Sequence, residues 1–126
     1  MVRTAITAPA AAAVGPYSHG IASDGFVFLS GQTPQDPATG RLVEGSIADQ
    51  ARQCLANLGA VLGAAGLGFE DVVEVNVFLV DMADFAAMNA VYAETFSAPY
   101  PARTTIGVAA LPLGARVEMK LVAKAR

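Results

Sequence analysis

Two charged side chains in the C-terminal third of the chain have the types that small-molecule chemistry requires. Arg103 follows Pro101-Ala102 and is the only charged residue between Glu94 and Arg116. A guanidinium that borders apolar segments is suited to binding a carboxylate through paired hydrogen bonds. The spacing alone nevertheless favours a plainer interpretation, in which Arg103 is a solvent-exposed arginine in a loop.

Glu118 is the second candidate, and it lies in the alternating segment 116–123, where Val117 and Met119 face the opposite way. Its carboxylate can act as a general base or activate a water molecule if it is partly desolvated. The plainer interpretation is a charge pair with Arg116 or Lys120 on an exposed strand face. The residues by themselves favour that plainer interpretation.

The other reactive side chains are weaker candidates. His19 with Ser18 or Ser30 gives no hydrolase triad, because the Gly-x-Ser-x-Gly turn is absent and a histidine beside its own serine has poor geometry. Cys54 lies on or beside the apolar stripe of a predicted helix, which favours packing over nucleophilic chemistry. One cysteine and one histidine are too few for an ordinary structural zinc site, and no glycine-rich phosphate loop joins a strand to a helix.

Hydrophobic patterning predicts five strands that would position these side chains. Asp24-Gly25 is a strong hairpin signal between the first two strands, and apolar alternation marks the later ones. The expected strands are residues 17–23, 26–30, 72–80, 102–109 and 116–123. The alternation in 72–80 places one side of that strand in the core, namely Val73, Val75, Val77 and Leu79.

Two helices are also predicted, separated from the first strands by a turn-rich loop at residues 33–45. The first begins with Ser46 as N-cap, because Asp49 three residues later completes an acidic variant of the capping box. It ends before Gly66, a residue type common just after a helix. The second begins near Asp84 and is expected to bury Phe85, Met88, Tyr92 and Phe96.

This order of elements predicts a single domain of residues 1–126 with an α+β fold. We expect a mostly antiparallel sheet with both helices packed on one face. The opposite face is then left without a cover from its own chain, although it is too apolar to be comfortably exposed. It includes Asn76, Phe78, Val80, Glu118 and Val122.

The composition agrees with an interface on that face. Hydrophobic residues make up 54% of the 126 residues and charged residues only 15%, against a usual charged share of about 25%. We therefore expect part of the surface to be buried between subunits. A net charge of −3 without a basic stripe makes nucleic acid a poor partner. Because no run of about 20 apolar residues predicts a membrane span, we expect a cytoplasmic protein.

A series of short motifs runs in order over nearly the whole chain. They are Gly15-Pro16-Tyr17-Ser18, Ser30-Gly31-Gln32-Thr33-Pro34, Asp36-Pro37-x-Thr39-Gly40, Asn57-Leu58, Ala65-Gly66-Leu67, Asp71-Val72-Val73, Val77-Phe78-Leu79-x-Asp81-Met82-x-Asp84-Phe85, Met88-Asn89-x-x-Tyr92, Pro101-Ala102-Arg103, Leu111-Pro112 and Val117-Glu118. No single motif is decisive, but the set is highly specific. Together the motifs resemble the reactive intermediate deaminase A (RidA) family.

The resemblance implies a chorismate-mutase-like fold assembled as a homotrimer, with a central barrel and ligand clefts between neighbouring subunits. It implies hydrolysis of reactive enamines and imines, such as 2-aminoacrylate and 2-iminopropanoate, to a 2-oxo acid and ammonia, which protects pyridoxal-phosphate enzymes from damage. It implies neither a metal nor an organic cofactor. A non-catalytic module that binds small 2-oxo acids, and an endoribonuclease that inhibits translation, remain the alternatives.

The resemblance also implies a role for individual residues. Arg103 would bind the substrate carboxylate, and Glu118 would position or activate the attacking water. Tyr17 would form a wall of the pocket and orient the ligand. The supporting residues of the cleft would be Ser30, Gly31 and Asn89.

Two positions depart from the common pattern of the family. Thr105 stands where many members have a cysteine, so thiol chemistry is not expected, although its backbone can still contact the ligand. His19 stands where several members have glutamine. Because Arg103 and Glu118 are both retained, we expect a catalytic member of the family.

Overall fold

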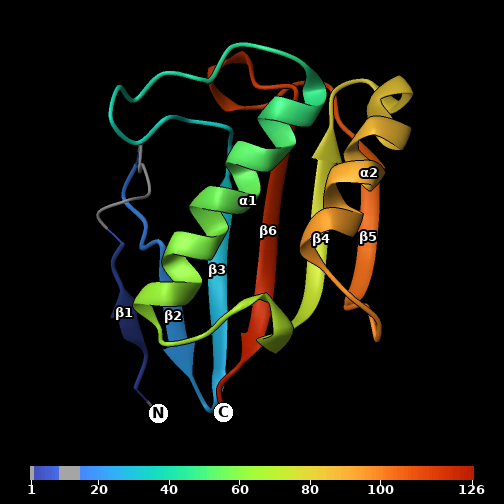
Figure 1. The fold of residues 1–126 in the computed structure, drawn as a ribbon. Coiled ribbons are helices and arrows are strands. Elements are labelled where there is room, and N and C mark those ends of the chain that lie inside the picture. Colours follow the sequence, from blue (N-terminus) through green and yellow to red (C-terminus); the bar gives the residue numbers. More distant parts are fainter. Residues whose placement is uncertain (1, 9–14) are drawn as a thin grey trace.

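Two α-helices pack on one face of a six-stranded sheet in the computed structural model, which describes residues 2–8 and 15–126 (Figure 1). The strands are β1 (Thr4–Ile6), β2 (Gly20–Ser23), β3 (Phe26–Gln32), β4 (Val72–Leu79), β5 (Ala102–Gly107) and β6 (Val117–Lys124). Their order across the sheet is β1-β2-β3-β6-β4-β5, and every neighbouring pair is antiparallel except β4 and β5. The predicted α+β fold with a mostly antiparallel sheet is confirmed.

The observed strands differ from the predicted ones at their ends. The expected strand at 17–23 is wrong in its first part, because only β2 pairs with β3 and Tyr17 lies in a bend just after Pro16, whose missing N–H cannot join a ladder. β3 continues to Gln32, and β5 ends at Gly107. β1 is an addition that the sequence did not predict, since a three-residue strand is too short to show alternation.

One residue expected in the core lies outside it. Val73 is 43% exposed, whereas Val75, Val77 and Leu79 are fully buried as predicted. The pairing of β4 with β6 shifts in register between Val72 and Glu74. Such an irregularity places one extra residue in a strand, so Val72 takes the core position and Val73 turns outward.

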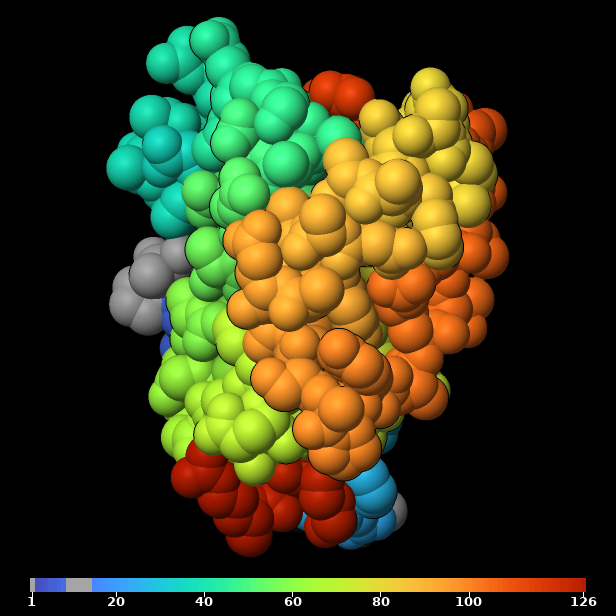
Figure 2. Space-filling view, turned by 45° about the vertical axis from the view of Figure 1, so that its right-hand side comes forward, coloured from blue at the N-terminus to red at the C-terminus, as the bar shows by residue number. Residues whose placement is uncertain are grey.

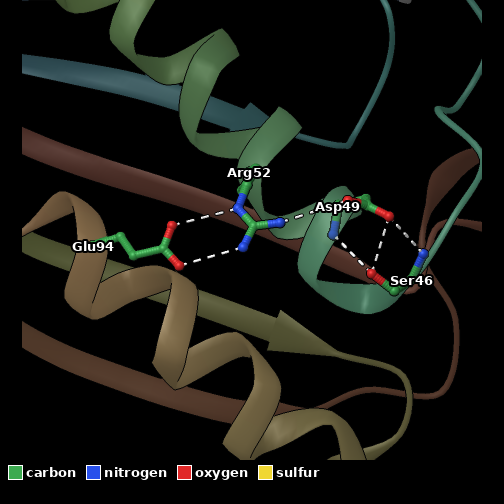
Figure 3. Close-up of polar contacts among 4 residues, drawn as sticks. All are labelled: Ser46, Asp49, Arg52 and Glu94. Atoms are coloured by element: carbon green, nitrogen blue, oxygen red, sulfur yellow. Dashed lines mark hydrogen bonds and ion pairs between the residues drawn. The ribbon is translucent and has the colours of Figure 1, made fainter.

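The first helix, α1 (Ile47–Ala64), has the predicted signals at both ends. The Ser46 N–H donates to Asp49 Oδ2 over 3.0 Å, and the Asp49 N–H donates to Ser46 Oγ over 3.2 Å (Figure 3). Gly66 follows the helix with a φ of +74°, which glycine adopts at low cost. Arg52 forms an exposed ion pair with Glu94 of the second helix, Nη2 to Oε2 over 3.3 Å (Figure 3), and such a pair contributes at most about 1 kcal/mol.

The second helix, α2 (Phe85–Thr95), lies beside α1 over the sheet (Figure 2). It buries Met88 and Tyr92 as predicted, and Phe96 is buried directly after it. Phe85 is only partly buried, although the sequence predicts it to be in the core; its ring lies against the half-buried side chain of Arg103. Short 3-10 turns precede β4, α2 and β6, namely η1 (Phe69–Asp71), η2 (Met82–Asp84) and η3 (Pro112–Gly114).

The sheet face turned away from the helices carries large exposed side chains. Phe28 and Ile106 on this face are 48% and 45% exposed. Phe78, Glu118 and Val122 on the same face are partly exposed. Within residues 2–8 and 15–126 no helix covers this face (Figure 1), so the apolar surface that the sequence predicts is present.

Candidate active site

A cavity of about 270 Å³ opens where the end of β3 meets the beginning of β6. The loop after β3 and Pro112 of η3 close its other sides. Four of the residues that line it are ones for which the sequence suggested a role, namely Tyr17, Ser30, Gly31 and Glu118. The structure therefore brings these four predicted site residues together.

Gly31 leaves room for the side chain of Glu118. The register of β3 against β6 shifts between Leu29 and Gln32, and the Glu118 side chain lies over the backbone of Gly31. A Cβ placed on Gly31 would overlap Oε2 of Glu118 and would lie 3.0 Å from its Cδ. The absence of a side chain at Gly31 thus allows the carboxylate to occupy this position.

Glu118 has no ion pair with any of the described residues. Arg116, which the plainer interpretation assigns to it, instead pairs with Asp84 across 3.1 Å. Burial raises the pKa of the Glu118 carboxyl above its ordinary value. A carboxyl with a raised pKa and no neutralising partner is better suited to accepting and returning a proton than a fully solvated carboxylate.

Ser30 and Tyr17 are placed by local backbone contacts. The Ser30 N–H donates to the His19 carbonyl over 2.9 Å, and Ser30 Oγ donates to the Ser18 carbonyl over 2.6 Å. These bonds fix the segment that carries Tyr17 against the end of β3. The Tyr17 ring is 43% exposed, so it forms a wall of the cavity that another molecule could contact.

Arg103 lies in β5 and is half-buried, so it is not the exposed loop arginine of the plainer interpretation. Its guanidinium carbon is 4.6 Å from the ring centroid of Tyr92 and 5.7 Å from that of Phe85. Both distances are within the range of a cation–π contact. With Asn89, Tyr92 and Tyr100, Arg103 lines a second hollow of about 340 Å³.

Thr105 and Asn89 carry polar atoms without partners near Arg103. Thr105 Oγ1 and Asn89 Oδ1 are buried and make no hydrogen bond in the part of the chain that the structure describes. Thr105 lies two residues after Arg103 in β5, so both side chains point to the same side of the sheet. Buried polar groups are nearly always hydrogen-bonded, so both atoms have unused hydrogen-bonding capacity close to Arg103.

Arg103 and Glu118 lie on opposite faces of the sheet. Arg103 pairs with Val75, whose side chain is fully buried under the helices. Glu118 pairs with Phe78 on the uncovered face, and its neighbours Val117 and Met119 point into the core. The predicted site residues therefore divide into two groups within one copy: Tyr17, Ser30, Gly31 and Glu118 in one, and Asn89, Arg103 and Thr105 in the other.

The other candidate side chains pack in the core or form local hydrogen bonds, as the sequence favoured. Cys54 is fully buried, and burial raises the pKa of its thiol, so it stays protonated at neutral pH. His19 Nδ1 accepts a hydrogen bond from the Ala8 N–H over 3.1 Å, and Ser30 Oγ is engaged with a carbonyl. Neither residue is arranged for nucleophilic catalysis.

The described residues contain neither a cluster of metal-ligating side chains nor a membrane-spanning helix. No group of three or more histidine, cysteine, aspartate or glutamate side chains within residues 2–8 and 15–126 is placed to hold a metal ion. None of the helices in that part of the chain has both the length and the apolarity needed to cross a membrane.

The sequence did not indicate Tyr92 and Gln32 as site residues. Helical periodicity identifies Tyr92 only as a core residue, because the contact with Arg103 depends on how α2 packs on β5. Gln32 stands in the motif Ser30-Gly31-Gln32, and its side chain lines the first cavity. Its Nε2 is buried and has no hydrogen-bond partner among the described residues. Its place in that short polar motif is the signal that the sequence offers, whereas its burial depends on the fold.

Comparisons with known proteins identify the family of this chain. The family model described as Endoribonuclease L-PSP matches residues 6–125. The chain is 47% identical over 117 residues to 2-iminobutanoate/2-iminopropanoate deaminase of Capra hircus, with 93% of this chain and 85% of the relative covered.

Two solved structures are similar to this fold. A protein of the conserved Rid family from Yersinia pestis, YyfA, superposes with a TM-score of 0.94 at 39% identity, and the match covers 98% of this chain and all of that one. E. coli TdcF with bound serine superposes with a TM-score of 0.92 at 38% identity, with 98% and 99% covered. Since the family model spans nearly the whole sequence and the relatives match along their length, the chain belongs to the Endoribonuclease L-PSP family, in its reactive intermediate deaminase branch.

Proposed function

We propose that this protein hydrolyses 2-imino acids and their enamine tautomers, such as 2-iminopropanoate and 2-aminoacrylate, to 2-oxo acids and ammonia. The observation that carries the proposal is the Glu118 carboxyl, which lies over Gly31 in a small cavity, has a raised pKa and has no charged partner. Relatives named 2-iminobutanoate/2-iminopropanoate deaminase, at 44–47% identity, support the same reaction. The reaction needs no cofactor, because a protonated imine is already electrophilic.

The reaction is a hydrolysis, in which water replaces the nitrogen on C2 and the C=N bond becomes a C=O bond. Protonated 2-iminopropanoate, CH3–C(=NH2⁺)–COO⁻, and water give CH3–CO–COO⁻ and NH4⁺. In the first step Glu118 accepts a proton as the water oxygen bonds to C2 and the C=N electron pair moves to nitrogen. In the second step Glu118 returns the proton to the amine nitrogen and the C2–N bond breaks. The hydroxyl becomes the carbonyl oxygen as its proton passes to the departing ammonia.

The substrate carboxylate would be bound by Arg103 through paired hydrogen bonds. Asn89 and Thr105, whose buried polar atoms have no partner among the described residues, would line the same end of the ligand. Tyr17 would close the cleft, and Ser30 and Gly31 would form its floor. The similar structure of E. coli TdcF was solved with bound serine, which carries a carboxylate beside a nitrogen-bearing carbon as the proposed substrate does.

The complete site would lie between two copies of the chain. Because Arg103 and Glu118 face opposite sides of the sheet, one copy would supply Arg103 and a neighbour would supply Glu118. The apolar face that includes Phe28 and Ile106 would be covered by this association. We propose the homotrimer of single-domain subunits, with three such clefts, and a cytoplasmic location.

The activity is tested by generating 2-aminoacrylate with a serine or threonine dehydratase and trapping the remaining imine as its semicarbazone. Wild-type protein is expected to accelerate imine loss, and Arg103→Ala is expected to lose most of that acceleration. If wild type removes imine no faster than Arg103→Ala, the deaminase proposal is wrong. Calorimetry that shows binding of a 2-oxo acid without turnover would point to the non-catalytic alternative.

The shared site is tested by complementation. Arg103→Ala and Glu118→Ala chains are co-expressed with different tags and purified together through both. Purification through both tags leaves only mixed trimers, and in each of them about one site in three receives Arg103 from one chain and Glu118 from the other. About a third of the wild-type activity is therefore expected, although each variant alone is inactive. A mixed assembly as inactive as the single variants would refute the shared site and leave the reaction itself untouched.

The family description also names endoribonuclease activity. The net charge of −3 and the scattered basic residues offer no basic stripe for a phosphate backbone. Cleavage of RNA by freshly purified protein, lost in Arg103→Ala, would favour this second function.

A further inference from the structure

The surroundings of Arg103 are aromatic instead of acidic. Its guanidinium carbon lies 4.6 Å from the centroid of the Tyr92 ring and 5.7 Å from that of Phe85. Phe85 and Tyr92 are seven residues apart in α2, so both rings lie on the face of the helix that meets β5. Within residues 2–8 and 15–126, no carboxylate forms an ion pair with Arg103.

This arrangement differs from that of the arginines that form ion pairs. Arg52, Arg116 and Arg126 each form an ion pair with an acidic side chain. A carboxylate partner holds an arginine in place, but it also occupies the N–H donors that an anionic ligand would need. An aromatic ring attracts the cation through its π face and leaves those donors unoccupied.

The Tyr92 ring is itself fixed by packing. Its side chain is buried, and its centroid is 4.5 Å from that of Phe96, which packs edge-on against Phe69. Burial raises the pKa of the Tyr92 hydroxyl, while the charge of Arg103 partly opposes this rise. A ring fixed in this way can restrict the rotamers of a long, flexible side chain.

We propose that Tyr92 is a positioning residue for Arg103: its ring face holds the guanidinium with the N–H donors free to bind the substrate carboxylate. Phe85 supports the same guanidinium from a greater distance. Tyr92 acts through Arg103 and does not touch the reacting atoms. This inference rests on the proposed function only in naming the carboxylate as that of a 2-imino acid.

The experiment compares Tyr92→Leu, which removes the ring, with Tyr92→Phe, which restores the ring face without the hydroxyl. A cation–π contact of this kind corresponds to an affinity change of about 3- to 30-fold. Tyr92→Leu is therefore expected to raise the KM for the imine by about that factor, with a smaller change in kcat. Tyr92→Phe is expected to rescue most of the loss. Val91→Ala, which weakens the core beneath the same helix without touching Arg103, is the control for destabilisation.

Two readouts that need no catalysis accompany the kinetics. The δ-methylene protons of Arg103 are expected to show a ring-current shift in the NMR spectrum of wild type and Tyr92→Phe, and to lose it in Tyr92→Leu. Calorimetric titration with 2-oxobutanoate, a carboxylate that does not react, is expected to show the same order of affinities as the KM values. These readouts remain informative if wild type proves not to be a deaminase.

Several results would overturn the proposal. One is a Tyr92→Leu variant with wild-type KM and wild-type Arg103 shifts, and another is a Val91→Ala variant with the same rise in KM as Tyr92→Leu. A Tyr92→Phe variant as impaired as Tyr92→Leu would assign the effect to the hydroxyl instead of the ring. If 2-oxobutanoate does not bind to wild type, Arg103 is not positioned to bind a carboxylate and the proposal is wrong.

Discussion

Replacing Gly31 with alanine is expected to disturb catalysis through Glu118 while leaving the fold intact. A methyl group on Gly31 would overlap Oε2 of Glu118 and would lie 3.0 Å from Cδ and 3.3 Å from Cγ. No backbone atom is among these nearest neighbours, and Gly31 is absent from the residues with a positive φ. The strain can therefore be relieved if the carboxylate moves away.

The size of the effect follows from that movement. An ordinary carbon–oxygen contact is about 3.4 Å or longer, so the carboxylate oxygen has to move by about 1 Å or more. A misplacement of about 1 Å in a catalytic constellation can cost about 100-fold in rate, which corresponds to about 2.7 kcal/mol of transition-state stabilisation. We expect kcat/KM for Gly31→Ala to fall by about 10- to 100-fold. Its stability should stay within about 1 kcal/mol of wild type, because alanine also restricts the unfolded chain.

The dehydratase-coupled imine assay measures the rate, and thermal unfolding measures the stability. Gly63→Ala is the matched control, because a Cβ at Gly63 in α1 meets no atom within 4 Å; it should keep full activity and gain up to about 1 kcal/mol of helix stability. Because Glu118→Ala is itself expected to be inactive, the coupling between the two residues is measured as stability. Any destabilisation by Gly31→Ala should disappear in a Glu118→Ala background, where no carboxylate has to move. Wild-type activity in Gly31→Ala, or the same loss of stability in both backgrounds, would refute the reasoning.

Three further outcomes are expected. Burial raises the pKa of Glu118 in the fold. The protonated carboxyl therefore contributes fully to the free energy of unfolding below the unfolded pKa of about 4.3, and this contribution is lost as the pH rises through the higher folded pKa. In denaturant titrations Glu118→Gln should match wild-type stability in acid and exceed it at pH 7, and it should have no deaminase activity. Cys54 is fully buried, so a thiol reagent should leave it unmodified in the folded protein and modify one thiol per chain in denaturant. Ser46→Ala should lower the free energy of unfolding by about 1 kcal/mol through loss of the N-cap, whereas Arg52→Ala should lower the free energy of unfolding by less. Both variants should turn over imine at the wild-type rate.

The sequence predicts those elements whose signals are local. Ser46 and Asp49 are three residues apart, so their reciprocal hydrogen bonds depend on one helical turn, and the structure has both. Val73 was expected in the core because alternation assumes a regular ladder, and the register shift that turns it outward arises only from pairing with β6. β1 was missed for the same reason, since Thr4–Ile6 acquires its strand conformation by pairing with β2.

The candidate site was predicted residue by residue but not as an arrangement. Motifs in the sequence name Arg103 and Glu118, and strand alternation places Glu118 on the uncovered face. The side on which Arg103 lies depends on the parallel pairing of β5 with β4, which places it opposite the buried Val75. Its contact with Tyr92 depends in addition on how α2 packs on that edge of the sheet. Both are tertiary features without a local signal in the chain.

Association would change the pKa of Glu118 in two opposite directions. In one copy the carboxyl is already partly desolvated and has no cation beside it, so its pKa is raised. A second copy that covers the open face would exclude more water and raise the pKa further, while the charge of its Arg103 would favour the ionised carboxylate and lower the pKa. In an empty cleft the charge of Arg103 would thus favour Glu118 as a base. When a substrate carboxylate neutralises Arg103, that lowering is reduced, and Glu118 becomes a better proton donor for the leaving amine. An aromatic support for Arg103 suits this sequence of events, because a permanent carboxylate partner would neutralise the guanidinium before the substrate arrived.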